Sequence, residues 1–130
     1  MADPKLDSAG VQKLKTLDDA LLLLQRINGI VEQYALAQKR DQPTSVFVQN
    51  IRRQLPSLAE NLKGHFGMIS DVIMGVNLAA SRGASEIVRL RALREGMAQI
   101  RQGIEIAMTQ TKAKHAVDER DKDASSPAAT

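Results

Sequence analysis

The apolar residues of this chain recur at alternating intervals of three and four positions over most of its length, which strongly limits the secondary structure it can adopt. Only an α-helix turns such spacing into one continuous stripe. The first pattern consists of Leu17, Ala20, Leu24, Ile27, Val31 and Tyr34. Similar patterns run from Val48 to Ala79 and from Leu90 to Ala107, and no useful length of strand-like alternation interrupts them. The sequence therefore predicts an all-α protein.

Helix-breaking residues between the three patterns set the expected helix boundaries. Pro43 should end the first helix, because proline disfavours the helical conformation of the residue before it. Gly83 suits the left-handed cap of a second helix, and Ser85 suits the N-cap of a third. We expect helices at about 9–40, 44–81 and 85–114. Because proline removes a hydrogen bond inside a helix, we expect either a kink near Pro56 or a short helix joined to a longer one that starts at Pro56.

Short connections between three long helices predict an elongated antiparallel bundle, running up, down and up, with coiled-coil-like heptad seams. Residues 9–115 would form this single domain. Residues 1–8 and 116–130 carry charges and small side chains without a periodic apolar face. Both termini, including the charged C-terminal tail, are therefore expected to be disordered.

Composition and motifs argue against several classes of function. The 130 residues include no Cys and only two His, so disulfides and Cys-ligated zinc sites are excluded. The sequence has no Glu-x-x-His pair for a metal site in a bundle and no glycine-rich phosphate loop after a strand. No constellation of polar groups for acid–base chemistry emerges either. We therefore expect no enzyme, no catalytic residue, no cofactor and no metal ion.

The sequence also carries no signal for export or for a membrane. Residues 1–8 lack the basic segment followed by an apolar run that marks a secretory signal. The longest lightly charged stretch, 64–81, is 18 residues long and is interrupted by polar side chains, whereas a membrane span needs about 20 predominantly apolar residues. We expect an intracellular protein, in the cytoplasm or the nucleus, without a transmembrane segment.

Positive charge is concentrated in the third predicted helix. Eighteen Lys and Arg against fifteen Asp and Glu give the chain a net charge of +3. Residues 82–115 alone hold seven basic and three acidic residues, a balance of +4. The electrostatic candidates are Arg82, Arg89, Arg91, Arg94 and Arg101. Arg89, Arg94 and Arg101 flank the heptad seam, where such side chains pair with acids on a neighbouring helix. The alternative is that the basic residues bind an acidic protein, an anionic membrane surface or nucleic acid. Nucleic acid is the least favoured, because three aromatic residues offer no stacking platform.

A second candidate surface lies on the second predicted helix. At about 100° per residue, Met74 and Leu78 point away from that helix's broad apolar face. Beside them lie Gly67, Asp71 and Gly75. The pair is either two surface residues without a task or a surface for docking or dimerisation. Gly96 and Gly103 on the third helix pose a similar choice between tight packing in the bundle and contact with a partner.

These observations favour a non-enzymatic protein-binding module, a small adaptor or scaffold that presents bundle faces to one or more proteins. Its mechanism would be helix docking at Met74 and Leu78, with the arginines of the third helix steering acidic partners. A second copy of the chain is among the expected partners. The alternative is an electrostatic binder of an anionic membrane surface or nucleic acid through the basic strip of the third helix.

Overall fold

A computed structural model describes residues 6–81 and 85–116 of the chain. Within these residues the protein is all-helical apart from one isolated β-bridge. The described helices are α1 (Ser8–Lys39), α2 (Ser45–Lys63), α3 (Gly67–Ser81) and α4 (Glu86–His115). None of them is both long enough and apolar enough to cross a lipid bilayer.

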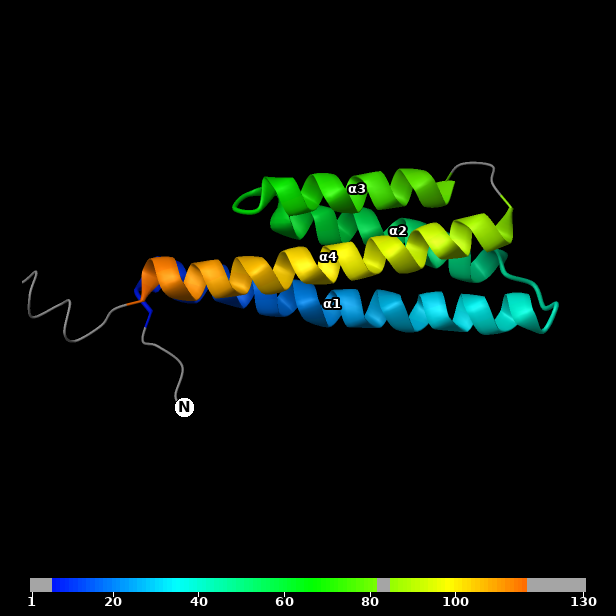
Figure 1. Cartoon of the computed structure of the whole chain (residues 1–130), viewed down its shortest axis with the longest axis horizontal. Helices are drawn as coiled ribbons and strands as arrows, with labels where there is room; N and C mark the ends of the chain where they lie inside the picture. The colour runs from blue at the N-terminus through cyan, green and yellow to red at the C-terminus, as the bar shows by residue number, and fades with distance from the viewer. Residues whose placement is uncertain (1–5, 82–84, 117–130) are drawn as a thin grey trace, which may run out of the picture.

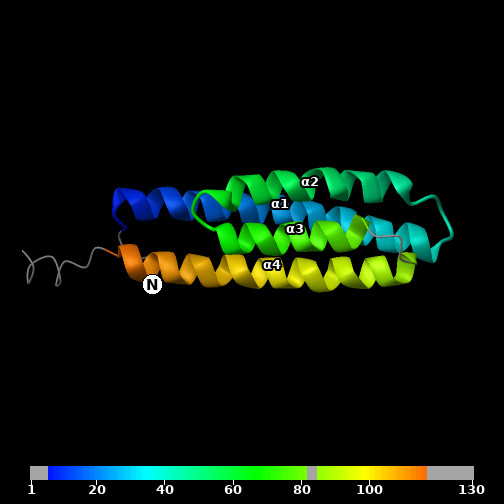
Figure 2. The ribbon, with the colours of Figure 1, turned by 90° about the horizontal axis from the view of Figure 1, so that it is seen from above.

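The four helices pack as a ring in which each touches two others (Figures 1 and 2). The two long helices, α1 and α4, lie side by side, and the shorter α2 and α3 form a hairpin against them. Consecutive helices run in opposite directions. Within the described residues α1 contacts α2 and α4, whereas α3 contacts α2 and α4 but not α1. Helices α1 and α3 therefore occupy opposite corners of the bundle.

The prediction of three helices was wrong, because the predicted helix at 44–81 is a hairpin of two helices. The chain turns at Gly64–Phe66, and α2 continues through Pro56 rather than ending there. Glycine is a poor helix former, and glycines stand on both sides of the turn, at positions 64 and 67. The spacing of three and four positions continues in register through Leu62, His65 and Ile69, so the sequence pattern does not reveal the turn. His65 is in fact exposed in the turn.

Folding back at this turn lets both halves of the hairpin bury apolar side chains against α1 and α4. The turn is held by the backbone N–H of Phe66, which donates to the carbonyl oxygen of Leu62 at 2.7 Å. Complete burial of one such side chain stabilises a fold by about 1.5–3 kcal/mol. The fully buried core contains Leu17, Ile27, Val31, Tyr34, Ile51, Leu55, Leu58, Leu62, Ile73, Leu93, Ile100 and Ile104. Every helix contributes to it.

Local hydrogen bonds define the helix ends. Asp7 caps α1 by accepting from the Gly10 N–H at 2.7 Å, and Ser85 caps α4 by accepting from the Val88 N–H at 3.3 Å. Helix α1 ends at Lys39 because Asp41 adopts a left-handed conformation, with φ of 57°. The expected cap at Gly83 and the candidate Arg82 lie outside the described residues.

Helices α1 and α4 extend beyond the turn between α2 and α3 at one end of the molecule (Figure 1). There Leu6 forms an isolated antiparallel bridge with Ala116, and the Asp7 N–H donates to the His115 carbonyl oxygen at 3.1 Å. Residues 6–8, which the sequence placed in a disordered terminus, are thus held against α4. The rest of both predicted termini, 1–5 and 117–130, lies outside the described residues.

Candidate interaction surfaces

The side of α3 that faces away from the bundle exposes four large apolar side chains. Met68 is 85% exposed, Val72 41%, Met74 44% and Leu78 55%. We call this side the outer face of α3; it comprises Met68, Asp71, Val72, Met74, Gly75, Leu78 and Ala79. Asp71 is the single charged residue of the whole helix. A helix face turned toward water normally carries several charged or polar residues, so this face is unusual for a helix without a partner.

The opposite side of α3 accounts for its position in the bundle. Ser70, Ile73, Val76 and Ala80 are buried there. Val76 fits against Gly96 of α4 so closely that a Cβ atom on Gly96 would lie 2.5 Å from Val76 Cγ2. Gly96 is therefore a packing residue, as one of the two interpretations held. Gly103 is less constrained, because a Cβ there would lie 3.6 Å from Ile69 Cγ1, an ordinary contact distance.

The close approach of α3 and α4 leaves a shallow groove of about 380 Å³ beside the outer face. Its lining is made mostly of small and apolar side chains: Val72, Gly75, Val76, Ala79, Ala92, Glu95, Gly96 and Gln99. Small residues allow another backbone to come near. The groove and the outer face of α3 therefore form one continuous, largely apolar surface.

Four of the five predicted docking residues, Asp71, Met74, Gly75 and Leu78, lie together on the outer face of α3, and the fifth, Gly67, is the first residue of that helix. The sequence interpretation missed Met68 and Val72. A signal for both was present, because positions 68, 72, 75 and 79 follow the same spacing of four and three as the core stripes.

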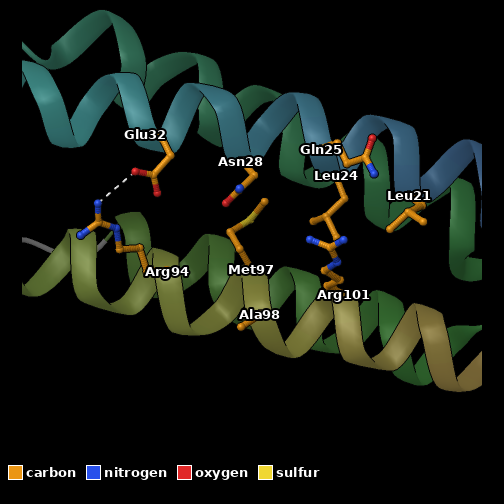
Figure 3. Close-up of a pocket in the computed structure, with 9 residues that line it drawn as sticks. All are labelled: Leu21, Leu24, Gln25, Asn28, Glu32, Arg94, Met97, Ala98 and Arg101. Carbon is orange, nitrogen blue, oxygen red and sulfur yellow. Dashed lines mark hydrogen bonds and ion pairs between the residues drawn. The ribbon is translucent and has the colours of Figure 1, made fainter.

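A second groove, of about 310 Å³, lies between α1 and α4 (Figure 3). Leu21, Leu24 and Met97 supply its apolar part. Its polar lining includes Arg94, whose guanidinium contacts Glu32 Oε2 of α1 at 3.1 Å, drawn as the dashed line in Figure 3. This ion pair is exposed on both sides, so it contributes little more than about 0–1 kcal/mol. It matches the flanking role that one interpretation gave to the arginines.

The other arginine candidates do not gather into one open basic surface. Arg89 Nε donates to the carbonyl oxygen of Ala80, near the end of α3, at 3.0 Å. Arg101 Nε pairs with Glu105 Oε1 on the same helix at 3.0 Å. Arg91 is exposed, and no hydrogen bond or ion pair joins it to another described residue. Three of the four arginines that can be placed are thus engaged within the bundle.

A polar cluster joins the two ends of the described chain. His115 Nδ1 lies 3.1 Å from Asp7 Oδ1, and its Nε2 lies 3.2 Å from Lys13 Nζ. Because a charged lysine can only donate, this geometry assigns the ring proton to Nδ1, which donates to Asp7. The contact spans 108 positions of the chain, so no local sequence pattern predicts it.

The hydrogen bond from the Gly10 N–H holds the pKa of the Asp7 carboxyl below its ordinary value, with smaller contributions from His115 and Lys13. The cluster therefore fastens α1 to α4 at this end. Among the described residues, no group of three or more His, Cys, Asp or Glu side chains is placed to hold a metal ion.

Comparison with protein-family models, with curated proteins and with solved structures finds no match to this chain. The molecule is an all-helical protein with one helix whose outer side is apolar. Its function is therefore argued from its surfaces.

Proposed function

We propose that this protein is a non-enzymatic interaction module, an adaptor or scaffold, whose outer face of α3 binds the apolar side of another protein helix. One observation carries the proposal: Met68, Val72, Met74 and Leu78 are exposed on a helix with a single charge. Contiguous apolar surface of this kind marks interaction sites. An apolar helix lying in a groove is a recurrent mode of recognition.

The side chains of this face suit helix docking. Methionine is unbranched and flexible, so Met68 and Met74 can adapt to a partner's surface. The groove beside them is lined by small residues such as Ala79 and Ala92, which let a partner helix lie close to α3. Binding would remove apolar area from water, which is favourable by roughly 25 cal/mol per Å² before the costs of association.

The electrostatic alternative gains less support from the arrangement of the arginines. Arg89 bonds to a carbonyl oxygen near the end of α3, whereas Arg94 and Arg101 each hold a carboxylate in an exposed ion pair. We therefore assign Arg89 to packing between helices, and Arg94 and Arg101 to pairing with acids beside the seam. Of the described candidates, Arg91 retains the proposed role of steering acidic partners.

Affinity capture with matched variants tests the proposal. The test variant is Met74→Lys/Leu78→Lys. The control is Leu22→Lys/Leu36→Lys on α1, because these leucines are 64% and 46% exposed and lie on the opposite corner of the bundle. Circular dichroism and thermal melting establish that both variants fold. We expect the proteins captured by the wild type to be lost with the α3 variant and retained with the α1 variant.

Equal capture by the wild type and by both folded variants would contradict the proposal. Loss of capture with both variants would also contradict it, because the effect would then follow from added charge rather than from α3. The salt dependence of binding distinguishes the proposal from the electrostatic alternative. Binding through α3 should persist at high ionic strength, whereas binding through the basic strip should weaken steeply.

A further inference from the structure

The glycine at the centre of the outer face of α3, Gly75, packs against no other described residue of its own chain. A Cβ atom at Gly75 would meet nothing within 4 Å, and no described glycine has a positive φ angle that would exclude other residues. Glycine inside a helix costs roughly 0.5–1 kcal/mol relative to alanine. Neither packing nor backbone conformation within the described chain offsets this cost.

Gly29, on α1, is also open within 4 Å, and comparison of the two positions is informative. The residues one helical turn from Gly29 are all polar: Gln25, Arg26, Glu32 and Gln33. Those around Gly75 are mostly apolar: Asp71, Val72, Leu78 and Ala79. A glycine framed by exposed apolar side chains allows another backbone to approach closely and bury its neighbours. Gly75 meets this condition and Gly29 does not.

The sequence outside the described residues offers no cover for this face. Residues 1–5, 82–84 and 117–130 contain two large apolar side chains in all, Met1 and Val117. The last fourteen residues hold six charged side chains, which would be costly to bury against hydrocarbon. Another polypeptide chain is therefore the better candidate to cover the outer face, which the described residues leave exposed.

The position of its one charge makes the face complementary to itself. If two α3 helices cross antiparallel at Gly75, Val72 of one copy lies opposite Leu78 of the other. Asp71 lies opposite Ala79, and the two Asp71 residues are separated by eight positions, about 12 Å along the helix axis. That separation exceeds the Debye length of about 8 Å at physiological salt. A parallel pair would set the two Asp71 carboxylates side by side.

We propose that the occupant of the outer face of α3 is α3 of a second copy, in a two-fold symmetric dimer whose helices run antiparallel and cross at Gly75. Two-fold dimers are the commonest closed assemblies. The inference rests on the proposed function, since it names the partner at the same surface. A helix of another protein and a second copy of the chain would bind the same surface and therefore compete. The dimer is then the form of the protein when no other partner is bound.

The size of the interface sets the expected strength of the dimer. Helix α3 has 15 residues and is therefore about 22 Å long. Stable interfaces bury about 800 Å² on each partner, more than the outer face of so short a helix supplies alone. We therefore expect a reversible dimer with a Kd of about 1–100 μM, which exchanges readily with a competing helix.

Sedimentation equilibrium of the full chain tests the dimer, with two alanine variants as a matched pair. Gly75→Ala should make the monomer more resistant to heat, yet raise the dimer Kd about tenfold or more, because a methyl group holds the crossing helices apart. Gly29→Ala should give the same gain in heat resistance and leave the dimer Kd unchanged. Leu78→Lys should raise the Kd at least about 30-fold. Opposite effects of one methyl group on folding and association exclude misfolding as the cause.

Cysteine pairing tests the antiparallel orientation, because the natural chain contains no cysteine. When Val72→Cys and Leu78→Cys proteins are mixed under mild oxidation, the disulfide between the two different variants should form in preference to a disulfide between two copies of one variant. Two residues at position 72 would be about 9 Å apart along the axis, which is too far for a disulfide, whose Cα atoms lie about 4.4–6.8 Å apart. Preferential self-cross-linking of either variant would overturn the arrangement.

A wild-type protein that stays monomeric up to about 1 mM, or equal dimer affinities for Gly75→Ala and Gly29→Ala, would overturn the dimer. The proposal that the outer face of α3 binds a helix of another protein is tested by a different result. A monomer that loses a captured protein on Met74→Lys/Leu78→Lys substitution would overturn self-association and leave the docking function standing. If that double variant changed neither self-association nor capture, both proposals would be wrong.

Discussion

Helices α2 and α3 belong to one hairpin, and each packs against one of the long helices, α2 against α1 and α3 against α4. Their outward sides nevertheless differ in chemistry. The exposed side of α2 carries one large apolar residue, Val46, near its start. Its other exposed residues are polar or charged and include Gln49, Arg52, Arg53, Ser57, Glu60 and Lys63. The outer face of α3 carries one charge, Asp71, among methionine, valine, leucine and small residues. Both helices bury an inner stripe, with four large apolar side chains in α2 and two, Ile73 and Val76, in α3. Packing within the bundle therefore explains their inner sides and leaves the outer side of α3 unexplained.

This contrast separates two reasons for an apolar residue. Leu55 and Ile73 are apolar because they lie fully buried in the core. Met74 and Leu78 are substantially exposed within the same bundle, so no contact inside it requires them to be apolar. Helix α2 shows that this architecture accepts a polar outward side. This contrast supports the proposal that the inner side of α3 is buried in its own bundle and its outer face is buried against another helix.

The largest expected effect comes from two neighbouring positions of α3. Ile73→Ala should lower the free energy of unfolding by about 2–4 kcal/mol, because it removes a fully buried side chain and leaves a cavity. Met74→Ala should change it by no more than about 0.5 kcal/mol in the monomer. Urea denaturation of dilute protein measures both. Comparable losses at the two positions would show that the outer face contributes to the fold itself.

A smaller effect is expected at the contact between α3 and α4. Gly96→Val should lower the free energy of unfolding by about 1–3 kcal/mol through overpacking, because the new side chain would collide with Val76. The matched change Gly75→Val places the same side chain in open space. It should cost far less stability, although valine has a modest helix propensity. If both variants were equally unstable, the distinction between a fitted inner side and an open outer side would be lost.

The smallest effect is expected at the end of the molecule that the hairpin does not cover, and it depends on pH. The folded protein holds the pKa of Asp7 below its ordinary value of 3.8. The stability that this carboxylate contributes is therefore fully present above that value and is lost as the pH falls through the lower folded pKa. NMR spectra recorded on acidification should show the ends of α1 and α4 changing before α2 and α3. Asp7→Asn should remove this early change, and a simultaneous change in all four helices would contradict it.

Much of the fold follows from the sequence because the seams of α1 and α4 are long and regular. Leu17, Leu24 and Ile27 were expected on one stripe and are buried together. The turn between α2 and α3 was missed because its apolar spacing stays in register across Gly64–Phe66. The chain reverses there because a single long helix would lose packing contacts with the neighbouring helices. Such tertiary energetics are not visible in local spacing.

The candidate surface was likewise predictable from the sequence only in part. The outward direction of Met74 and Leu78 follows from helical geometry, and both are exposed. The fit of Val76 against Gly96 and the pairing of Asp7 with His115 bring together residues distant in the sequence. Their partners depend on how the helices pack, so the sequence pattern cannot assign them. The contrast between Gly75 and Gly96, on which the proposals depend, likewise required the three-dimensional contacts.

Methyl NMR of labelled methionine tests most directly whether the outer face of α3 binds the same face of a second copy. Met68 and Met74 lie on that face, whereas Met97 is 4% exposed inside the bundle and serves as the internal control. We predict that raising the protein concentration from about 10 μM to about 1 mM shifts the methyl signals of Met68 and Met74 and leaves that of Met97 in place. Shifts that are absent at Met74, or equal at all three methionines, would contradict the account.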